Sequence, residues 1–363
     1  MNLQHRYIRE MQKKIKIDGR LISDNSPPLL VAEISANHQN SINKTFKILE
    51  AAAKAGLEAV KFQTFNLDDM TIRSSNNEFQ IKQSFKDKKW NSRSLYSIYK
   101  EAQFPYKWHK SVFKKARSLG LICFSSVFDT KSLKLLESLN APAYKIASLE
   151  SLHFPLIENV CKTNKPILIS TGTLDENEIK ELLNFLKKIN YKKYLIMHCV
   201  SDYPTKNKDV NLKFIAKLKK KYNCLVGFSD HTCNLGASIS SISFGACMVE
   251  KHFKLNKNQN SLDSKFSLTP NEMKLLNFEI KNAWLSIGKS KKKLTTGEKF
   301  VKKYRRSIYS VKNIKKGEIF SVDNIKIIRP GKGLPPKFYY NLIGKKSPKD
   351  IKLGSSIKSS ILK

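Results

Sequence analysis

The feature that most constrains the fold is a series of eight short apolar segments separated by longer amphipathic stretches. The segments are rich in Val, Ile and Phe, and the stretches repeat apolar residues at helical spacing. Eight β/α units in series close most economically as a parallel barrel, so the predicted fold class is α/β, a (β/α)₈ TIM barrel. The predicted strands are 29–35, 59–64, 121–126, 143–148, 166–171, 194–199, 224–229 and 246–251.

The chain of 363 residues is longer than the roughly 250 that a barrel needs. We predict an N-terminal extension and cap over 1–28, the catalytic barrel over 29–287, a lysine-rich linker over 288–304, and a small, mostly β module over 305–363. A module of about 60 residues is marginal alone and is expected to lean on a partner. The long segment 66–103 is expected to wall the site.

The formal net charge of +37 is extreme, and nearly all of the excess is lysine spread along helix-like stretches. A polyanion partner such as nucleic acid or an anionic membrane is one interpretation. It predicts a basic stripe with interleaved aromatic residues, which the sequence lacks. We therefore expect solvated helix faces, and neither nucleic acid nor membrane as a partner.

Six cysteines occur without any CxxC pairing, and most fall within apolar runs. This pattern indicates buried thiols in a reducing compartment. Residues 1–16 are polar and basic, and no run of about 18 apolar residues occurs. A cytoplasmic, unanchored protein is the expectation.

Polar residues stand at the ends of the predicted strands, where barrel enzymes place their active sites. Period two puts Lys61 on one face with Gln63, and Ser229 on one face with His231, so each pair can point into the barrel mouth. These strand-end residues are Glu33, Lys61, Gln63, Ser126, Lys145, Ser148, Ser170, Ser229, His231 and His252.

Two of these residues are lysines inside hydrophobic strands, Lys61 and Lys145. A buried lysine is costly unless it is paired or faces a ligand charge, so the favoured interpretation is an anion-binding site. The alternative is an internal salt bridge to Glu33, Glu150 or Glu250.

His231 and His252 end consecutive predicted strands and could share one metal ion, with water or substrate in the open positions. Two histidines alone are a weak metal signal. General acid–base work and ordinary hydrogen bonding remain alternatives.

Six ordered motifs together resemble the sialic acid synthase family. They are Val31-Ala-Glu-Ile-Ser-Ala-Asn-His38, Lys61-Phe-Gln-Thr64, Tyr144-Lys-Ile-Ala-Ser148, Ser170-Thr-Gly172, Gly227-Phe-Ser-Asp-His-Thr232 and Glu250-Lys-His-Phe253. The resemblance spans nearly the whole chain from about residue 15. It includes Arg329-Pro-Gly-Lys-Gly333 in the tail, which is similar to the antifreeze-protein-like (SAF) module of that family.

The resemblance implies a metal-dependent transferase that condenses phosphoenolpyruvate with an amino-sugar aldehyde. Glu33, Lys61 and Lys145 would be catalytic, and His231 and His252 would bind Mn²⁺ or Mg²⁺, which would polarise the aldehyde. It also implies a swapped homodimer in which Arg329 reaches a second subunit's barrel. The substrate-binding residues would be Gln63, Ser126, Ser148, Glu150, Ser170, Tyr203, Ser229, Asp263 and Arg329.

Within the family, 33–38 and 263–270 are most similar to the pseudaminate-forming branch, whose sugar is 2,4-diacetamido-2,4,6-trideoxy-L-altrose. The alternatives are the branches that form N-acetylneuraminate or legionaminate by the same mechanism. More distant alternatives are a basic binding protein without catalysis and a catalytically dead scaffold.

Overall fold

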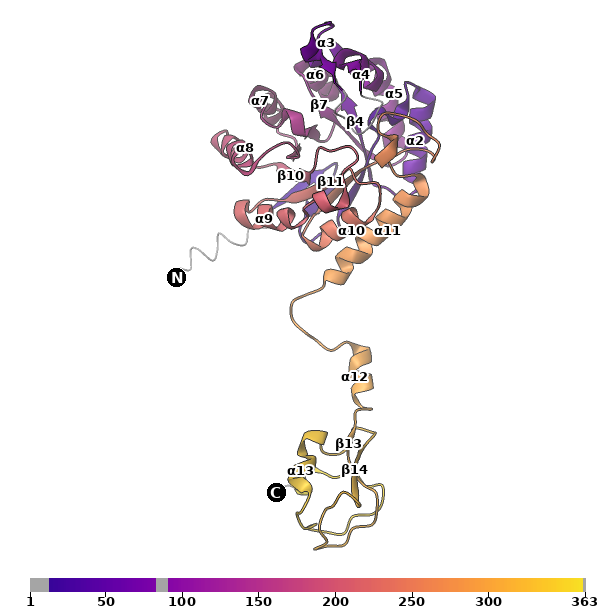
Figure 1. Cartoon of the computed structure of the whole chain (residues 1–363), viewed down its shortest axis with the longest axis vertical. Helices are drawn as coiled ribbons and strands as arrows, with labels where there is room; N and C mark the ends of the chain where they lie inside the picture. The colour runs from indigo at the N-terminus through magenta and orange to yellow at the C-terminus, as the bar shows by residue number, and fades with distance from the viewer. Residues whose placement is uncertain (1–12, 83–90, 362–363) are drawn as a thin grey trace. The chain divides into compact units, whose positions relative to one another are not determined.

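The computed structural model describes residues 13–82 and 91–361. The chain divides into two compact units between Gly288 and Lys289 (Figure 1). The larger unit holds the predicted barrel, and the smaller one holds the predicted β module.

Eight parallel strands form a closed barrel in chain order, which confirms the predicted fold class. The first strand pairs with the last, with His252 opposite Glu33 in the register. Each strand reads as an apolar run because both of its faces are covered. The strands are β3 (Leu29–Glu33), β4 (Ala59–Thr64), β7 (Ile122–Val127), β8 (Tyr144–Ile146), β9 (Ile167–Ser170), β10 (Tyr194–Cys199), β11 (Val226–Asp230) and β12 (Met248–His252).

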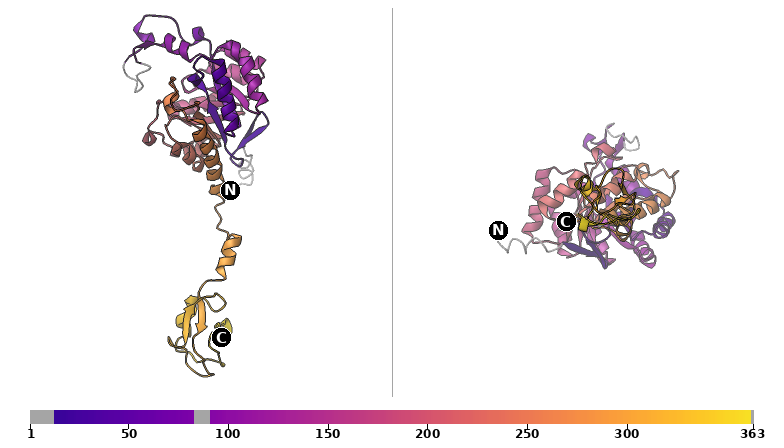
Figure 2. Two further views of the ribbon diagram at one scale, coloured as in Figure 1. Left: turned by 90° about the vertical axis from the view of Figure 1, so that its right-hand side faces the viewer. Right: turned by 90° about the horizontal axis from the view of Figure 1, so that it is seen from below.

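Helices surround the strands (Figures 1 and 2). Capping boxes stabilise the starts of two of them: Asp175 and Glu178 cap α8, and Thr269 and Glu272 cap α11. Their apolar faces pack on the outer side of the barrel. The helices are α2 (Ile42–Lys54), α5 (Tyr106–Ser118), α6 (Thr130–Ser138), α7 (Phe154–Lys162), α8 (Glu176–Lys188), α9 (Lys213–Tyr222), α10 (Gly236–Ser243) and α11 (Pro270–Ile287).

A hairpin of β1 (Lys14–Ile17) and β2 (Arg20–Ser23) precedes the barrel. Its two-residue turn, Asp18-Gly19, has positive φ at both positions, as such hairpins require. Ile15, Ile17 and Ile22 pack with residues near the starts of the barrel strands. The hairpin therefore closes the amino-terminal end of the barrel, and the opposite end is left for a site.

The inserted segment after β4 contains α3 (Leu67–Met70), α4 (Leu95–Ala102) and a short antiparallel pair, β5 (Gln80–Ile81) with β6 (Arg93–Ser94). Ile98 of α4 is buried against Ala36 and Leu262. The insertion therefore packs on loops that follow β3 and β12 at the carboxyl end of the barrel. Residues 83–90 of the segment expected to wall the site, Trp90 among them, lie outside the described residues.

The smaller unit is built around a hairpin of β13 (Ser307–Ser310) and β14 (Ile325–Ile328), followed by α13 (Tyr339–Leu342). Its core contains Ile308, Ile325 and Leu342, among other apolar residues. The segment predicted as a linker contains a helix that was not predicted, α12 (Thr296–Lys302). A capping box of Thr295 and Glu298 stabilises its start.

No helix among residues 13–82 and 91–361 is both long enough and apolar enough to cross a membrane. Five cysteines of the described chain are buried and unpaired, while the sixth, Cys233, is exposed.

Candidate active site

Four charged side chains from four strands meet inside the carboxyl end of the barrel: Glu33, Lys61, Lys145 and Glu250. All four are at most 4 % exposed. Lys61 pairs with Glu33, lies 3.5 Å from Glu250 Oε1, and donates to Ser126 Oγ at 2.9 Å. The two lysines and two carboxylates balance in charge, which lowers the cost of burying them.

Lys145 donates to both oxygens of Glu250, at 3.1 and 3.0 Å, and Ser229 Oγ donates to Glu250 Oε1 at 3.1 Å. Both lysines are therefore engaged in internal ion pairs, the alternative considered from the sequence. Lys61 pairs with Glu33 and Glu250, and Lys145 pairs with Glu250. An anionic ligand at this place would compete with these carboxylates for the lysines.

The two carboxyl groups differ in acidity. Burial raises the pKa of Glu33 to about 7, against the opposing effect of Lys61. Burial would also raise the pKa of Glu250, but the adjacent Lys145 and Lys61 lower it to about 2. Glu33 is therefore the carboxyl group of the cluster suited to exchange a proton near neutral pH.

His231 and His252 stand together at the ends of β11 and β12, with ring centroids 5.5 Å apart. His231 Nδ1 lies 2.9 Å from the carbonyl oxygen of Val200, so a proton on Nδ1 would donate there and leave Nε2 with a free lone pair. His252 Nδ1 is buried without a hydrogen-bond partner and lies 3.9 Å from Asp263 Oδ2. Burial lowers the pKa of both imidazoles, which favours the neutral, metal-binding form.

These two imidazoles fit a divalent cation as a partial ligand set. The carbonyl of Val200 fixes the tautomer of His231, as hydrogen-bond partners of metal-bound histidines do. His252 has a buried ring nitrogen without a hydrogen-bond partner. Across the two described ranges, no group of three or more His, Cys, Asp or Glu side chains is arranged to hold a metal. Water and substrate would have to complete the coordination.

A tight turn follows β9, which lies between β8 and β10 in the barrel. Gly172 donates its backbone N–H to Ser148 Oγ at 3.0 Å, and Ser148 Oγ lies 3.1 Å from Cys199 Sγ. A Cβ at position 172 would lie 2.4 Å from Ser201 Oγ, 2.7 Å from Cys199 Sγ and 3.0 Å from Ser148 Oγ, so a side chain there would force these groups to move. Ser170 ends β9 at this turn and is buried.

The residues predicted to contact a sugar line the same end of the barrel. Gln63 donates to Glu33 Oε1 at 3.4 Å, and Asp263 Oδ2 accepts from the backbone N–H of Ala36 at 3.3 Å. Glu150 Oε2 is buried without a hydrogen-bond partner, and burial raises the pKa of Glu150 to about 7. Tyr203 is 38 % exposed, with its ring centroid 4.5 Å from that of His231.

Arg329 follows β14 in the smaller unit. The predicted site residues of the barrel unit lie at the carboxyl ends of its strands or in the loops that follow them, and Arg329 belongs to a separate unit.

Asn37 is a site residue that the sequence did not single out. Its Nδ2 donates to the carbonyl oxygen of Phe253 at 2.9 Å and to Ser267 Oγ at 2.8 Å, and its Oδ1 accepts from Gln259 Nε2 at 3.2 Å. Asn37 thus joins the turn after β3 to the loop after β12 that carries Asp263. The signal available in the sequence was the amide of Asn37 within the Val31–His38 motif, since an amide side chain adds nothing to apolar packing.

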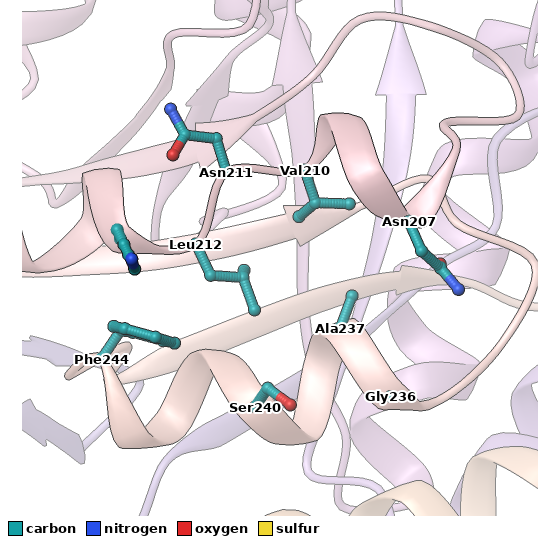
Figure 3. Close-up of a pocket in the computed structure, with 9 residues that line it drawn as sticks. Asn207, Val210, Asn211, Leu212, Gly236, Ala237, Ser240 and Phe244 are labelled. Atoms are coloured by element: carbon teal, nitrogen blue, oxygen red, sulfur yellow. The ribbon is translucent and has the colours of Figure 1, made fainter.

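A surface cavity of about 440 Å³ lies away from this cluster, on the outside of the barrel (Figure 3). Val210 and Leu212, before α9, face Ala237 and Phe244 of the α10 region across it. Its lining contains none of the predicted site residues.

A closed parallel barrel with buried lysines, carboxylates and two histidines at its carboxyl end, joined to a small β module, defines a barrel enzyme for anionic substrates. Residues 48–292 match the NeuB family, and residues 305–362 match the SAF domain. The chain belongs to the NeuB family, which confirms the resemblance found in its motifs.

Similar proteins cover nearly the whole chain. It is 40% identical over 333 residues to the pseudaminic acid synthase of Campylobacter jejuni strain 81-176, covering 91% of this chain and 95% of that one. It is 38% identical to the Helicobacter pylori pseudaminic acid synthase, with coverages of 91% and 96%. It is 34% identical to the C. jejuni N,N'-diacetyllegionaminic acid synthase, with coverages of 89% and 97%.

Among solved structures, the N-acetylneuraminic acid synthetase of Leptospira borgpetersenii, in complex with citrate, superposes with a TM-score of 0.71 at 25% identity. The match covers 80% of this chain and 95% of that one.

Proposed function

We propose that this protein is a pseudaminic acid synthase. It condenses phosphoenolpyruvate with 2,4-diacetamido-2,4,6-trideoxy-L-altrose and water to give pseudaminic acid and phosphate. The observation that carries the proposal is the buried cluster of Glu33, Lys61, Lys145 and Glu250 beside two histidines. Relatives named for this reaction, at 38% to 40% identity, support the choice of sugar.

Phosphoenolpyruvate carries a phosphate and a carboxylate, and the two lysines supply the matching charge. Lys61 and Lys145 turn from Glu33 and Glu250 to these groups when the ligand enters. Hydroxyl groups around them complete the anion site, from Ser126, Ser148, Ser170 and Ser229.

The reaction forms a carbon–carbon bond between carbon 3 of phosphoenolpyruvate and the aldehyde carbon of the open-chain sugar. The electron pair comes from the enol double bond, and positive charge develops at carbon 2. The aldehyde oxygen takes up one proton to become a hydroxyl group, which balances the proton released by the water that adds at carbon 2. Glu33, ionised, stabilises that charge and accepts a proton from the water that adds there. Phosphate then leaves with cleavage of its bond to carbon 2.

His231 and His252, whose rings lie together, would hold a divalent cation, Mn²⁺ or Mg²⁺, and water and substrate would supply the remaining ligands. When bound, the ion supplies Lewis-acid polarisation of the aldehyde. The unpartnered Nδ1 of buried His252 supports this role, because such a nitrogen otherwise costs free energy.

Gln63, Glu150, Tyr203 and Asp263 bind the sugar, and Arg329 of one chain completes the site of a second chain in a swapped homodimer. Apolar side chains exposed within each unit leave apolar surface for a further packing contact. Phe278 and Leu285 of α11 are 61% and 67% exposed, and Phe300 and Val301 of α12 are 57% and 63% exposed. The buried free thiols support a cytoplasmic location.

Phosphate release from phosphoenolpyruvate in the presence of Mn²⁺, with mass spectrometry of the products, tests the proposal. The altrose sugar, N-acetylmannosamine and a legionaminate precursor are supplied in parallel. Turnover of the altrose sugar alone, lost with chelator and in His231→Ala, is expected. Turnover of another sugar would support the mechanism and refute the proposed sugar specificity. No phosphate release with any sugar or metal would refute the proposal.

A further inference from the structure

A second ion pair lies on the outer side of the same two strands. Asp230 and Lys251 are partners in the β11–β12 register, and each directly adjoins one of the two histidines in the sequence. Lys251 Nζ lies 3.0 Å from Asp230 Oδ2, and both side chains are fully buried. Because strand side chains alternate, the pair points away from the barrel interior that the histidines face.

The outer faces of these strands are otherwise apolar. Phe228 precedes Asp230 on its face by two residues, and Val249 and Phe253 flank Lys251 in the same way; all three belong to the core between barrel and helices. Apolar side chains at 230 and 251 would continue that core. A buried ion pair is weak evidence for stability, since well-packed apolar replacements are often as stable. The charges therefore call for a role other than filling space.

Their hydrogen bonds converge on the residue after His231. Asp230 Oδ1 accepts a hydrogen bond from the backbone N–H of Thr232 at 2.8 Å. This hydrogen bond closes a turn whose central residue is His231. Lys251 Nζ donates to the carbonyl oxygen of Thr232 at 2.5 Å. Both backbone groups of Thr232 are thus bound by the pair, and the backbone on either side of His231 is fixed.

The pair is also anchored to the helix that covers it. Ser238 of α10 donates its hydroxyl to Asp230 Oδ2 at 2.5 Å. Lys251 has further contact with Thr232 Oγ1 at 3.4 Å. Strand β11, strand β12 and α10 therefore meet at one charged point directly behind the two imidazoles.

We propose that Asp230 and Lys251 are positioning residues, which hold the backbone of His231 and His252 so that the two imidazoles face one cation. This inference rests on the proposed function, because it assigns the histidines to a metal. The pair acts through the backbone of Thr232 and the register of the strands, and it does not touch the ion or the substrate.

Two variants and a control test the inference. Lys251→Met keeps the length of the side chain but removes its donors, and Asp230→Asn/Lys251→Met leaves no unpaired charge behind. Leu182→Ala is the control, since Leu182 is fully buried on α8 and its loss destabilises the barrel elsewhere. For each protein we would measure thermal unfolding without metal, Mn²⁺ affinity by electron paramagnetic resonance, and the imidazole ¹⁵N signals of metal-free protein.

We expect both variants to bind Mn²⁺ about 10- to 100-fold more weakly than the wild type, an effect as large as the loss of a hydrogen bond that orients a metal-binding histidine. The His231 ring signals should also lose the single tautomer protonated at Nδ1. The Leu182→Ala protein should keep both properties despite a lower melting temperature. Unchanged Mn²⁺ affinity and ring signals in the variants would overturn the inference and leave the pair a structural role only.

The two proposals can fail separately. If the wild type binds no Mn²⁺, the proposal that His231 and His252 hold a cation is refuted. The ring signals of the metal-free proteins still decide whether Asp230 and Lys251 position the histidines.

Discussion

Lys145 donates to both carboxylate oxygens of Glu250, at 3.1 and 3.0 Å, in a part of the barrel where both side chains are almost inaccessible to solvent. Glu250 takes the hydrogen-bonding position at Lys145 that the carboxylate or phosphate of a ligand would take. A ligand must therefore offer Lys145 a better partner than Glu250 does, and this competition makes the lysine a test of the anion site.

Lys145→Met is expected to raise the KM for phosphoenolpyruvate by about 10- to 100-fold, since charged hydrogen bonds contribute about 1.5–3 kcal/mol each. Glu250 keeps Lys61 and Ser229 as partners, so the fold should persist. Steady-state kinetics at saturating sugar measures the effect. Lys162→Met, at an exposed lysine of α7, is the control and should behave as wild type.

Glu33→Gln is expected to lower kcat by about 10²- to 10⁴-fold, the range for loss of a general acid–base group. The KM for phosphoenolpyruvate should change little, because the amide keeps the shape and Lys61 retains Glu250. Single-turnover phosphate release measures the chemical step. Glu50→Gln, at a surface ion pair with Lys115, is the control; a Glu33→Gln protein with wild-type kcat would remove Glu33 from the chemistry.

The KM for the amino sugar is expected to fall as pH rises through about 7, because burial raises the pKa of Glu150 to that value and its ionised form accepts hydrogen bonds from the sugar. Glu150→Gln should abolish this pH dependence. A flat wild-type profile would contradict the assignment of Glu150 to the sugar.

The same group has the opposite effect on stability. The pKa of Glu150 is raised from 4.5 in the unfolded chain to about 7 in the folded one, so the folded state retains a proton that the unfolded state releases. Its contribution to stability is fully present below pH 4.5 and is lost as pH rises through 7. Thermal unfolding should show Glu150→Gln to be more stable than wild type above pH 7 and equal to it near pH 4.5.

Ile17→Ala is expected to destabilise the barrel unit by about 2–5 kcal/mol, since Ile17 is fully buried in the hairpin that closes the barrel. Leu21→Ala removes a side chain from the same hairpin that is 37% exposed, and it should cost much less. Urea-induced unfolding compares the two. Equal losses would show that the hairpin does not seal the barrel.

Mixing Glu33→Gln and Arg329→Ala proteins is expected to restore activity that neither has alone. In a swapped homodimer, one site of the mixed dimer has both Glu33 and the other chain's Arg329. Phosphate release after dissociation and reassociation of the mixture measures this recovery. No recovery, with dimers present by light scattering, would place Arg329 in the site of its own chain.

The barrel was predictable because its strands are buried on both faces and read as apolar runs. The ends of the strands were less so. Ser35 and Ser148 were assigned to strands but begin short 3-10 helices, and Ser35 has a φ of 40°. The Asp18-Gly19 turn was a hairpin signal of the strongest kind, yet the extension was predicted only as a cap.

The residues of the candidate site could be proposed from the sequence because polar side chains interrupt apolar strands at their ends. Their partners could not. Lys145 and Glu250 lie 105 residues apart, and nothing local to either sets which carboxylate meets which lysine. The Asp230–Lys251 pair depends on the register between β11 and β12, which the sequence alone does not specify.

The barrel closes between its first strand and its last, so Glu33 and His252 become neighbours only when both exist. A ribosome makes the chain from the amino terminus, and until residue 252 has emerged β3 keeps an open edge. No substrate or cation can stabilise the chain before that moment, since ligands stabilise only the state that binds them. The nascent barrel must therefore reach its last strand without stabilisation by its ligands.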